Sequence, residues 1–326
     1  MNPQVSLALR EHRCRPVPVA DLARELGLSP RQLGEALDEL ARRGFVIESH
    51  PMQGLQLVQG PASLVADEIR WNLAGARVGR HVRCEESTPS TNDLAWQVAA
   101  GGPDVADGLV VFAEYQSAGR GRRGNLWLAP PHTSILASVV LWMPASPSQA
   151  AHVTRAAAVA VAEAIEDQAD LDVGIKWPND IVVDDRKVGG ILVEARPAAG
   201  RAGPVVLGVG INCFQEEETF PNGIRADVAS LKMLGVEVDR TLLARSLLAR
   251  LEAIAPLANP AGFLAVAGRA ESRCRTLGRR ITLQEGLDAY TGEVIDLDPD
   301  YGLILRLDHG GIRRFPAMTS HVIGRG

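Results

Sequence analysis

Six short apolar runs between residues 109 and 211 constrain the fold of this chain more than any other feature. The runs are LVVFAEY (109–115), SILASVVLW (134–142), VGIKW (173–177), IVVDD (181–185), KVGGILVEA (187–195) and PVVLGVGI (204–211). Apolar runs of this length, rich in Val and Ile and separated by loops, predict buried β-strands. A long alanine-rich stretch, SPSQAAHVTRAAAVAVAEAIEDQ, lies between the second and third runs. The middle of the chain is therefore expected to be a sheet with this helix packed on it.

The first 60 residues have the pattern of a separate small unit. VPVADLARELGLS reads as a short amphipathic helix that ends at Gly27, and Ser29 can cap the next helix. The next segment, SPRQLGEALDELARRG, carries one apolar stripe, made of Leu33, Ala36, Leu37, Leu40 and Ala41. FVIESHPMQGLQLVQG then predicts a hairpin. This order is typical of a winged helix-turn-helix, and a helical packing module without a DNA role has the same pattern.

Two further helices and a β-rich end complete the expected layout. GPASLVADEIRWNLAG predicts a connecting helix, and DRTLLARSLLARLEAI predicts an amphipathic one. From about Leu277 the chain becomes short strands, including RRITLQ, TGEVIDL, GLILRL and IRRF. These strands predict a small β-barrel at the C-terminal end.

Composition narrows the classes of function. The net charge of −5 gives no support to nucleic acid as a bulk electrostatic partner, so any DNA contact would be local. The N-terminal segment lacks the apolar run of a signal peptide, and no stretch approaches the roughly 18 apolar residues of a transmembrane helix. The cysteines are far apart and predict neither a zinc site nor a disulfide framework; they are Cys14, Cys84, Cys213 and Cys274. These features predict a reduced, cytoplasmic protein.

The segment YQSAGRGRRGNLW contains the spacing G-x-G-x-x-G at Gly119, Gly121 and Gly124. A dinucleotide fingerprint needs a helix after the last glycine, and NLWLAPP cannot form one because of its prolines. A P-loop would need Lys followed by Ser or Thr. What remains is a flexible loop carrying Arg120, Arg122 and Arg123, whose guanidinium groups suit phosphate or carboxylate. Because adjacent arginines repel one another, we expect this loop to be disordered until an anion binds, and a solvated basic loop is the alternative.

Lysine is scarce in this chain, and its placement is informative. Among 34 basic Lys and Arg residues only Lys176, Lys187 and Lys232 are lysines. Two of them lie within the segment KWPNDIVVDDRKVGGILVE. An ammonium group is a compact point charge that fits between a carboxylate and a phosphate where a guanidinium is too wide. The pattern therefore favours a functional role for Lys187, whereas for Lys176 a structural ion pair remains an equal alternative.

Five motifs occur together in one order: ESTPSTND (86–93), GRGRRG, KWPND, KVGGILVE and GVGIN (208–212). The combination resembles the biotin–protein ligases, and with the N-terminal unit it resembles the bifunctional bacterial form that also represses the biotin operon. The resemblance implies an α+β fold in three parts. These are a winged helix-turn-helix at 1–62, a mixed-sheet core of the biotin/lipoate ligase type at 63–274, and an SH3-like β-barrel at 275–326.

The resemblance also implies a two-step reaction in the cytoplasm. Biotin and MgATP give biotinoyl-5′-adenylate, and a lysine of the biotin carboxyl carrier protein of acetyl-CoA carboxylase then takes the biotin. ATP and Mg²⁺ would be the cofactors, operator DNA a further partner, and the adenylate-bound protein a homodimer. Two anions must meet, so positive charge has to offset their repulsion.

The resemblance assigns residues to these roles. The catalytic group comprises Lys187, Arg120, Arg122 and Asp180. Biotin would contact Ser90, Thr91, Asn92, Gln116, Gly119, Arg120, Arg122, Lys187, Leu192, Gly208 and Gly210, the last two by allowing close approach of the bicyclic ring. ATP or the adenylate would contact Arg120, Arg122, Arg123, Trp127, Lys176, Asn179, Asn212 and Val228. Trp127 would also wall the biotin site together with Leu192. Asp180 would orient either the incoming lysine or the metal, and no metal ligand is assigned beyond it.

The regulatory half of this prediction rests on fewer residues. Arg31, Gln32 and Glu35 are the expected DNA-facing positions, but the same helix also carries Asp38 and Glu39. The loop QEEETFPNGIRADV lacks an aromatic residue near its end, so Val228 or Ile224 would form the apolar lid over adenine. The alternative function is a biotin-sensing transcription regulator with vestigial ligase activity. A lipoate or octanoate ligase would share the core, but KWPND with GRGRRG favours biotin.

Overall fold

The computed structural model describes residues 3–12, 15–73, 76–144, 146–196, 202–254 and 260–325 of the 326-residue chain. Cys14 lies outside these residues, and the three described cysteines are free thiols. No helix in the described ranges is long and apolar enough to cross a membrane.

The N-terminal unit folds around its own small core. Its elements are α1 (Gln4–Glu11), α2 (Val19–Leu26), α3 (Pro30–Arg42), β1 (Val46–His50) and β2 (Gly54–Gln59). Gly27 ends α2 in the left-handed conformation with φ of 64°, and Ser29 caps α3 in a capping box with Gln32. Leu33 and Leu40 of the predicted stripe are buried, whereas Ala41 is exposed, which corrects that part of the stripe.

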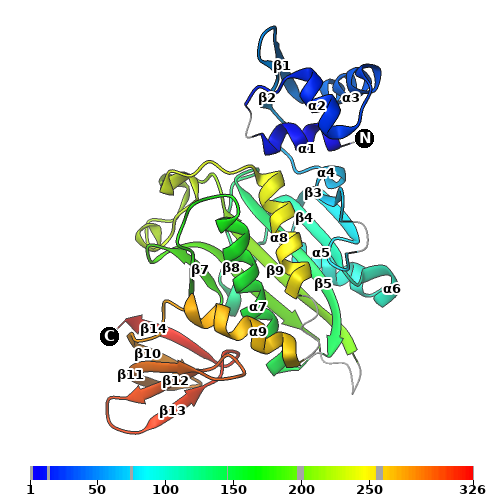
Figure 1. The fold of residues 1–326 in the computed structure, drawn as a ribbon. Helices are drawn as coiled ribbons and strands as arrows, with labels where there is room; N and C mark the ends of the chain where they lie inside the picture. Colours follow the sequence, from blue (N-terminus) through cyan, green and yellow to red (C-terminus); the bar gives the residue numbers. More distant parts are fainter. Residues whose placement is uncertain are drawn as a thin grey trace.

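A mixed sheet forms the centre of the molecule (Figure 1). Its strands are β3 (His81–Thr88), β4 (Leu109–Gln116), β5 (Ser134–Pro144), β6 (Gly174–Lys176), β7 (Asp180–Val183), β8 (Arg186–Ala195) and β9 (Ala202–Asn212). Their order is β3-β4-β5-β9-β8-β7-β6. β3 and β4 run parallel, and the other neighbouring pairs are antiparallel. The predicted six strands are present, and β7 ends at Val183 because Asp184 and Asp185 have positive φ and form the turn.

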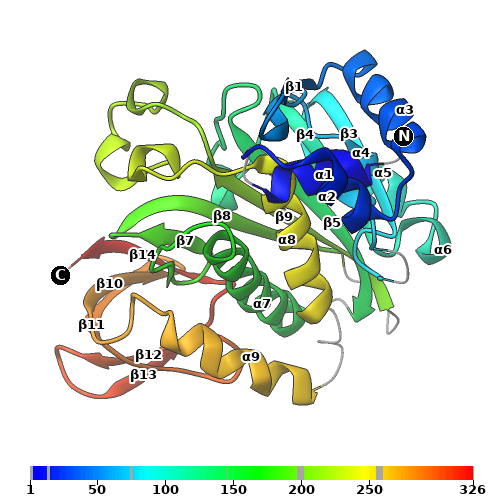
Figure 2. The same cartoon turned by 45° about the horizontal axis from the view of Figure 1, so that its top comes forward.

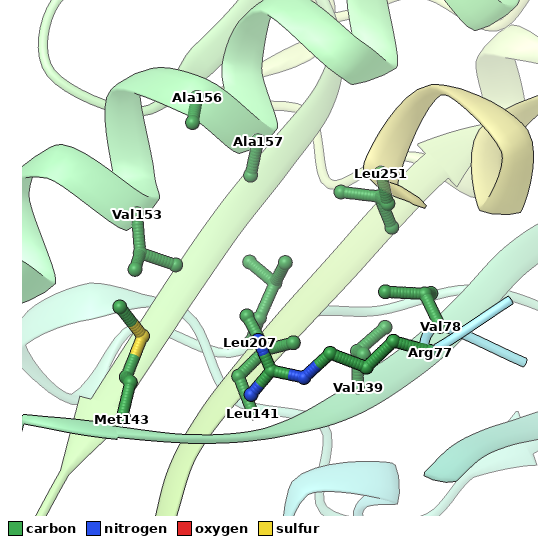
Figure 3. Close-up of a pocket in the computed structure, with 10 residues that line it drawn as sticks. All are labelled: Arg77, Val78, Val139, Leu141, Met143, Val153, Ala156, Ala157, Leu207 and Leu251. Carbon is green, nitrogen blue, oxygen red and sulfur yellow. The ribbon is translucent and has the colours of Figure 1, made fainter. Parts of the chain in front are cut away.

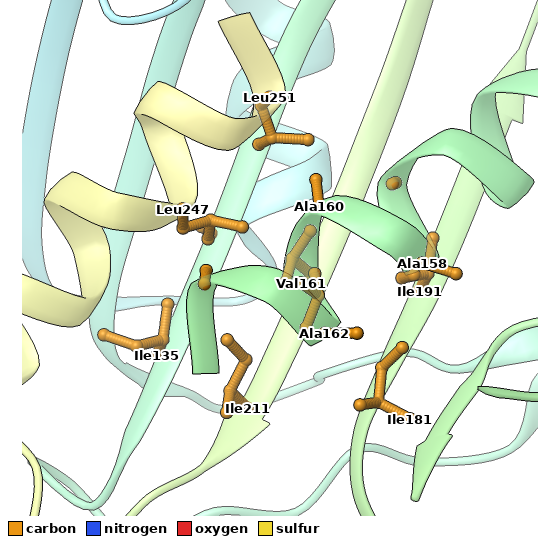
Figure 4. Packing of buried hydrophobic residues seen from close by; sticks show 14 of the residues in the cluster. Ile135, Ala158, Ala160, Val161, Ala162, Ile181, Ile191, Ile211, Leu247 and Leu251 are labelled. Atoms are coloured by element: carbon orange, nitrogen blue, oxygen red, sulfur yellow. The ribbon is translucent and has the colours of Figure 1, made fainter. Parts of the chain in front are cut away.

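Helices cover one face of this sheet (Figures 1 and 2). They are α7 (Pro147–Glu166), α8 (Arg240–Ile254) and α9 (Pro260–Ser272). Alanine at the facing positions of α7 lets the helix approach the strands closely, and Figure 4 shows Ala158, Ala160 and Ala162 among Ile and Leu side chains of β5, β7, β8, β9 and α8. This face contains the largest hydrophobic cluster among the described residues.

The opposite face is only partly covered. Helices α5 (Thr91–Ala99) and α6 (Pro103–Ala106) pack on it through Ala95, Ala99 and Ala106 against Val111 and Val206. Beyond α5 the same face of β9 and β8 carries Gly208, Gly210 and Gly190, whose missing side chains leave the sheet surface hollow. A loop segment containing the short turns η2 (Glu217–Thr219), η3 (Arg225–Asp227) and η4 (Lys232–Leu234) follows β9.

The C-terminal unit is an antiparallel sheet, ordered β13-β12-β11-β10-β14. Its strands are β10 (Arg280–Glu285), β11 (Asp288–Leu297), β12 (Leu303–Leu307), β13 (Ile312–Phe315) and β14 (Ser320–Arg325). The core contributes Trp177 to this unit: its indole Nε1 donates to the carbonyl of Tyr301 at 2.7 Å, and its ring is buried. The contact ties the turn that follows β6 to the C-terminal unit.

The connecting segment differs from its prediction. Of the helix expected over residues 60–75, the structure has α4 (Ala66–Arg70), which buries Ile69 in the core and Glu68 in an ion pair. Arg10 of α1 donates to both carboxylate oxygens of Glu68, at 3.0 and 3.1 Å, and to Asp239 at 2.6 Å. The N-terminal unit is thereby joined to α4 and to the start of α8.

Candidate active site

One large cleft, of about 790 Å³, opens on the hollow face of the sheet. Its walls come from the glycine-rich loop (residues 117–127), the KWPND turn (residues 176–180), the floor of β8 and β9, and β14 of the C-terminal unit. Most of the predicted site residues line it, namely Ser90, Thr91, Asn92, Gln116, Arg120, Arg122, Arg123, Trp127, Lys176, Asn179, Asp180, Lys187, Leu192, Gly208, Gly210 and Val228. Gly119 and Asn212 do not line it.

A second, much smaller space lies on the helical face (Figure 3). It measures about 20 Å³ and is lined by apolar side chains of β5, β9, α7 and α8, with the stem of Arg77 at one side. A cavity of this size holds about one water molecule. It is a gap in packing and does not compete with the cleft as a ligand site.

The glycine-rich loop folds back on itself over the cleft. The amide of Gly121 donates to the carbonyl of Asn125 at 2.7 Å, and the amide of Trp127 donates to Gly119 at 2.9 Å. A side chain at Gly119 would place its Cβ 2.5 Å from the carbonyl of Trp127. Gly119 therefore allows the loop to close, and the predicted contact of its backbone with biotin stays a prediction.

The three arginines of the loop turn to different partners. Arg120 donates both Nη atoms to the Asp93 carboxylate at 2.7 and 2.8 Å. Arg122 donates to Asn179 at 3.2 Å and to the carbonyl of Ala317 at 2.7 Å, and Arg123 donates to the carbonyl of Thr319 at 3.3 Å. The loop is ordered in the structure, contrary to the prediction, because each guanidinium has its own hydrogen-bond acceptor.

The arginines differ in the charge of their hydrogen-bond acceptors. The hydrogen bonds from Arg120 lower the pKa of Asp93, so this pair stays ionised at neutral pH and above. Burial lowers the pKa of Arg122, and the neighbouring Arg123 adds to the effect. The hydrogen-bond acceptors of Arg122 are an amide oxygen and a backbone carbonyl, both neutral. A partly buried guanidinium with neutral acceptors would gain free energy from an incoming anion.

The two lysines of the cleft also differ in whether they have an anionic partner. Lys187 Nζ lies 2.6 Å from the Asp180 carboxylate and 5.5 Å from the centre of the Trp127 ring. Lys176 forms no ion pair within the described ranges of the chain, so the structural alternative for this residue loses its basis. Its ammonium group lines the cleft, where it adds to the positive charge.

The end of the cleft near α5 is a hydrogen-bonded network. Gln116 accepts from the amide of Thr91 at 2.7 Å and from its hydroxyl at 3.1 Å, which leaves the Gln116 amide nitrogen free to donate elsewhere. Asn92 is held between the Ser138 hydroxyl at 2.6 Å and Glu194 at 2.8 Å. Ser138 and Glu194 were not predicted, although each is a polar residue inside an otherwise apolar strand, and that contrast is a usable signal.

The glycines of the floor make room for protein side chains. Gly190 and Gly210 are cross-strand neighbours, and Cβ atoms at these positions would lie 3.0 and 2.5 Å from the Trp127 ring. A Cβ at Gly208 would lie 2.6 Å from the Asn92 side-chain oxygen. Gly208 and Gly210 line the cleft, and the close approach of a bicyclic ring to them stays a prediction. Trp127 covers the floor, and its indole Nε1 is buried without a hydrogen-bond partner.

Asn212 is the clearest misplacement among the predicted site residues. Its amide nitrogen donates to the carbonyl of Ala229 at 3.0 Å, and its oxygen accepts from Gln215 at 3.0 Å. The side chain is 4% exposed and organises the chain after β9. That chain brings Ile224 and Val228 to the cleft, as the lid prediction requires.

The predicted DNA-facing residues lie far from the cleft, on α3. Arg31 forms an ion pair with Glu35 at 2.8 Å on the exposed side of the helix. The side-chain oxygen of Gln32 accepts from the Ser29 amide at 2.9 Å in the capping box. These contacts already occupy both side chains, so a DNA surface would have to displace them.

Comparison with known proteins points to one family. Residues 85–212 match the Biotin/lipoate A/B protein ligase family. The chain is 37% identical to the biotin–[acetyl-CoA-carboxylase] ligase of Mycobacterium tuberculosis over 252 residues, which cover 74% of this chain and 89% of that protein. It is 29% identical to the bifunctional ligase/repressor BirA of Bacillus spizizenii over 290 residues, which cover 89% of this chain and 88% of that one.

Solved structures give the same fold. The biotin protein ligase from Aquifex aeolicus in complex with biotin and ATP superposes with a TM-score of 0.63 at 22% identity. The match covers 75% of this chain and 99% of that chain.

Proposed function

The chain belongs to the biotin–protein ligase family, and from this premise we propose that its cleft forms biotinoyl-5′-adenylate and passes the biotin to a carrier lysine. In the first step the biotin carboxylate oxygen bonds to the α-phosphorus of ATP, and pyrophosphate leaves. In the second step a lysine ε-amine attacks the acyl carbon, and AMP leaves. The carrier is the biotin carboxyl carrier protein of an acetyl-CoA carboxylase.

The charge distribution around Arg122 carries this proposal. The first step brings a carboxylate to a phosphate, and charge increases around the phosphorus in the transition state. Arg122 has only neutral hydrogen-bond acceptors, Lys176 has no ionic partner in the described ranges, and both line the cleft. These two cations, with Lys187, are suited to the phosphate and the mixed anhydride. Catalysis then comes from positioning and electrostatics, since no enzyme nucleophile is needed.

The network near α5 suits the polar head of biotin. Because Gln116 accepts from Thr91 through its oxygen, its nitrogen is the free donor for a ureido carbonyl. Ser90 and Thr91 supply hydroxyl groups, and Leu192 an apolar wall. Asp180, which holds Lys187 at 2.6 Å, is placed to orient the incoming amine.

Magnesium would enter with the phosphates of ATP. Within the described ranges, no group of three or more His, Cys, Asp or Glu side chains could hold an ion without the nucleotide. Asp180 and Asp227 are the carboxylates on the cleft wall that would face a phosphate-bound ion, and the first is paired with Lys187. The ion would add positive charge on the phosphates, beside that of the cationic side chains.

The N-terminal unit is proposed to be a winged helix that binds an operator and makes the protein a repressor of biotin synthesis genes. The similarity to BirA across 89% of this chain favours this role, as does the order of α2, α3 and the β1–β2 hairpin. We further propose an SH3-like barrel for residues 275–326 and a homodimer for the adenylate-bound state.

The direct test is intact-mass analysis of an apo carrier domain after incubation with this protein, biotin and MgATP. We expect a mass gain of one biotin that depends on ATP and disappears when the acceptor lysine is changed to arginine. Biotin binding without any transfer would reject the ligase and leave the alternative, a biotin-sensing regulator. Replacing biotin with lipoate in the same assay checks the substrate.

A further inference from the structure

The hydrogen bonds of the glycine-rich loop suggest that its three arginines do not share one task. Arg120 is held by Asp93 of α5 through two contacts of 2.7 and 2.8 Å, and Glu194 of β8 lies 3.6 Å away. Arg122 and Arg123 instead donate to neutral oxygens of Asn179, Ala317 and Thr319. The loop thus spans the cleft, with an ionic anchor on α5 at one end and neutral anchors at the other.

An incoming phosphate should affect these anchors unequally. A guanidinium that leaves a carbonyl for a phosphate exchanges a neutral acceptor for a charged one and gains free energy. Arg120 would have to give up a carboxylate to do the same, so its gain is small. When the adenylate is bound, the anchors of Arg122 and Arg123 are therefore the ones that change, and the Asp93 anchor remains.

Glu194 links the Asp93–Arg120 ion pair to other side chains of the cleft. One of its oxygens accepts from Asn92 at 2.8 Å and from the indole of Trp96 at 3.1 Å, while the other faces Arg120. Asn92 in turn contacts Ser138 and lies over Gly208. Two carboxylates from different elements therefore fix one guanidinium beside the proposed ureido site.

We propose that Asp93 is a positioning residue, which through Arg120 keeps the glycine-rich loop across the cleft and so determines how long the adenylate is retained. This rests on the proposed function, because the retained ligand is the product of its first step. An adenylate that escapes reacts with water or with any exposed amine. Retention until the carrier lysine arrives therefore contributes to the specificity of transfer.

Asp93→Asn tests the proposal by removing the charge while keeping the size of the side chain. The variant is loaded with radiolabelled biotin and ATP, freed of excess ligand, and chased with unlabelled biotin. Because the pair is half-exposed, at 35% and 41%, we expect adenylate release about two- to fivefold faster than in the unchanged protein. Biotin attachment to a lysine-rich bystander protein should rise in proportion.

A matched control and a conservative variant keep the result specific. Asp308→Asn removes a similar two-contact pair with Arg280, at 3.2 and 2.5 Å, in the C-terminal unit, and should leave the release rate unchanged. Asp93→Glu keeps a carboxylate for Arg120 and should bring the release rate back toward that of the unchanged protein. Unchanged release in Asp93→Asn, or release as fast in Asp93→Glu as in Asp93→Asn, would overturn the proposal.

A second measurement does not depend on ligase activity. In the ligand-free protein, trypsin should cleave after Arg122 and Arg123 about two- to fivefold faster in Asp93→Asn than in the unchanged protein or in Asp308→Asn. Equal cleavage in all three proteins overturns the role of Asp93. If the unchanged protein forms no adenylate, the proposed function fails, and the cleavage rates still decide whether Asp93 fixes the loop.

Discussion

At the residue scale, the cationic side chains of the cleft differ in whether they contact a carboxylate. Arg120 and Lys187 each contact a carboxylate, whereas the hydrogen bonds of Arg122 and Arg123 go to neutral oxygens. Sequence spacing predicts that these side chains gather in one place. It does not predict their partners, because Asp93, Glu194 and Ala317 lie far away along the chain.

Lys187→Arg should reduce the rate of adenylate formation at least tenfold, although the charge is retained. The ammonium group lies between Asp180 and the Trp127 ring, and a Cβ at Gly190 would already be 3.2 Å from Lys187 Cε. A planar guanidinium is too wide for this space. Pyrophosphate release from saturating biotin and ATP measures the step, with Lys232→Arg as the control at an exposed position. Near-normal rates in Lys187→Arg would show that the scarcity of lysine in the chain does not indicate a specific role for Lys187.

Cys84 and Cys213 should resist alkylation in the folded protein. Burial raises the pKa of each thiol from 9.0 to about 12, with Glu114 and Glu85 adding to the effect at Cys84. At pH 8.5 this leaves about a thousandfold less thiolate than in the unfolded chain, so we expect iodoacetamide to react at least a hundredfold more slowly. Mass spectrometry with and without urea measures the ratio, and similar rates would contradict the burial.

The same shift has a defined sign for stability. A thiol whose pKa is higher in the folded state favours folding below the unfolded pKa of 9.0. That contribution is lost as the pH rises from 9 toward about 12. The free energy of unfolding should therefore decrease over this range and not below it, as far as these two groups are concerned.

The motifs predicted one site, and the fold brings most of their residues to one cleft. Asn212 and Gly119 do not line it, since a motif does not reveal whether a residue faces the ligand or supports its neighbours. The Gly210 position needs glycine for Trp127, and Asn212 stabilises the chain after β9. Ser138 and Glu194 were missed because their importance comes from contacts across the sheet.

At the element scale, the predicted strands and long helices are present, and the missed elements share a reason. The sequence HVRCEEST of β3 is an edge strand with exposed polar side chains, so it has no continuous apolar run. Helix α1 has no side-chain cap, and α9 contains Pro260 and two glycines. Local signals are weak in all three, and tertiary packing decides their structure.

Helix α4 illustrates how a short element depends on one ion pair. Glu68→Gln should lower the free energy of unfolding by about 2–4 kcal/mol, because the buried Arg10 would keep only Asp239 as an anionic partner. Glu35→Gln on α3 removes an exposed pair and should cost about 0.5 kcal/mol or less. Urea denaturation followed by circular dichroism compares the two. Equal effects would show that the Arg10–Glu68 pair does not join the units.

At the scale of the whole molecule, charged residues connect the N-terminal unit to the cleft. Asp239 pairs with Arg10 and is followed by Arg240, which donates to Glu114 of β4. Glu114 also accepts from the amide of Leu64 at 2.6 Å and lies two residues before Gln116, at the start of the glycine-rich loop. Strand β4 therefore takes part both in the contacts that join the N-terminal unit to the core and in the proposed biotin site.

Removal of residues 1–62 should separate the two proposed roles. The hydrophobic core of the N-terminal unit is a cluster distinct from those of the central sheet, so the remaining chain should fold and still attach biotin to a carrier. Operator binding, measured by footprinting with biotin and ATP present, should be lost. A truncated protein that still protects DNA would place the DNA-binding surface elsewhere.

The truncation also gives a decisive test of the junction when it is combined with Glu68→Gln. In the full chain the substitution leaves Arg10 short of a partner, whereas in the truncated chain Arg10 is absent. The decrease in the free energy of unfolding caused by Glu68→Gln, about 2–4 kcal/mol in the full chain, should therefore fall to about 0.5 kcal/mol or less after truncation. The difference between the two values is the coupling energy between the units. The same loss in both backgrounds would mean that Glu68 stabilises the core alone, through its contacts with α8. In that case Asp239 would be the acidic partner that joins Arg10 to the core.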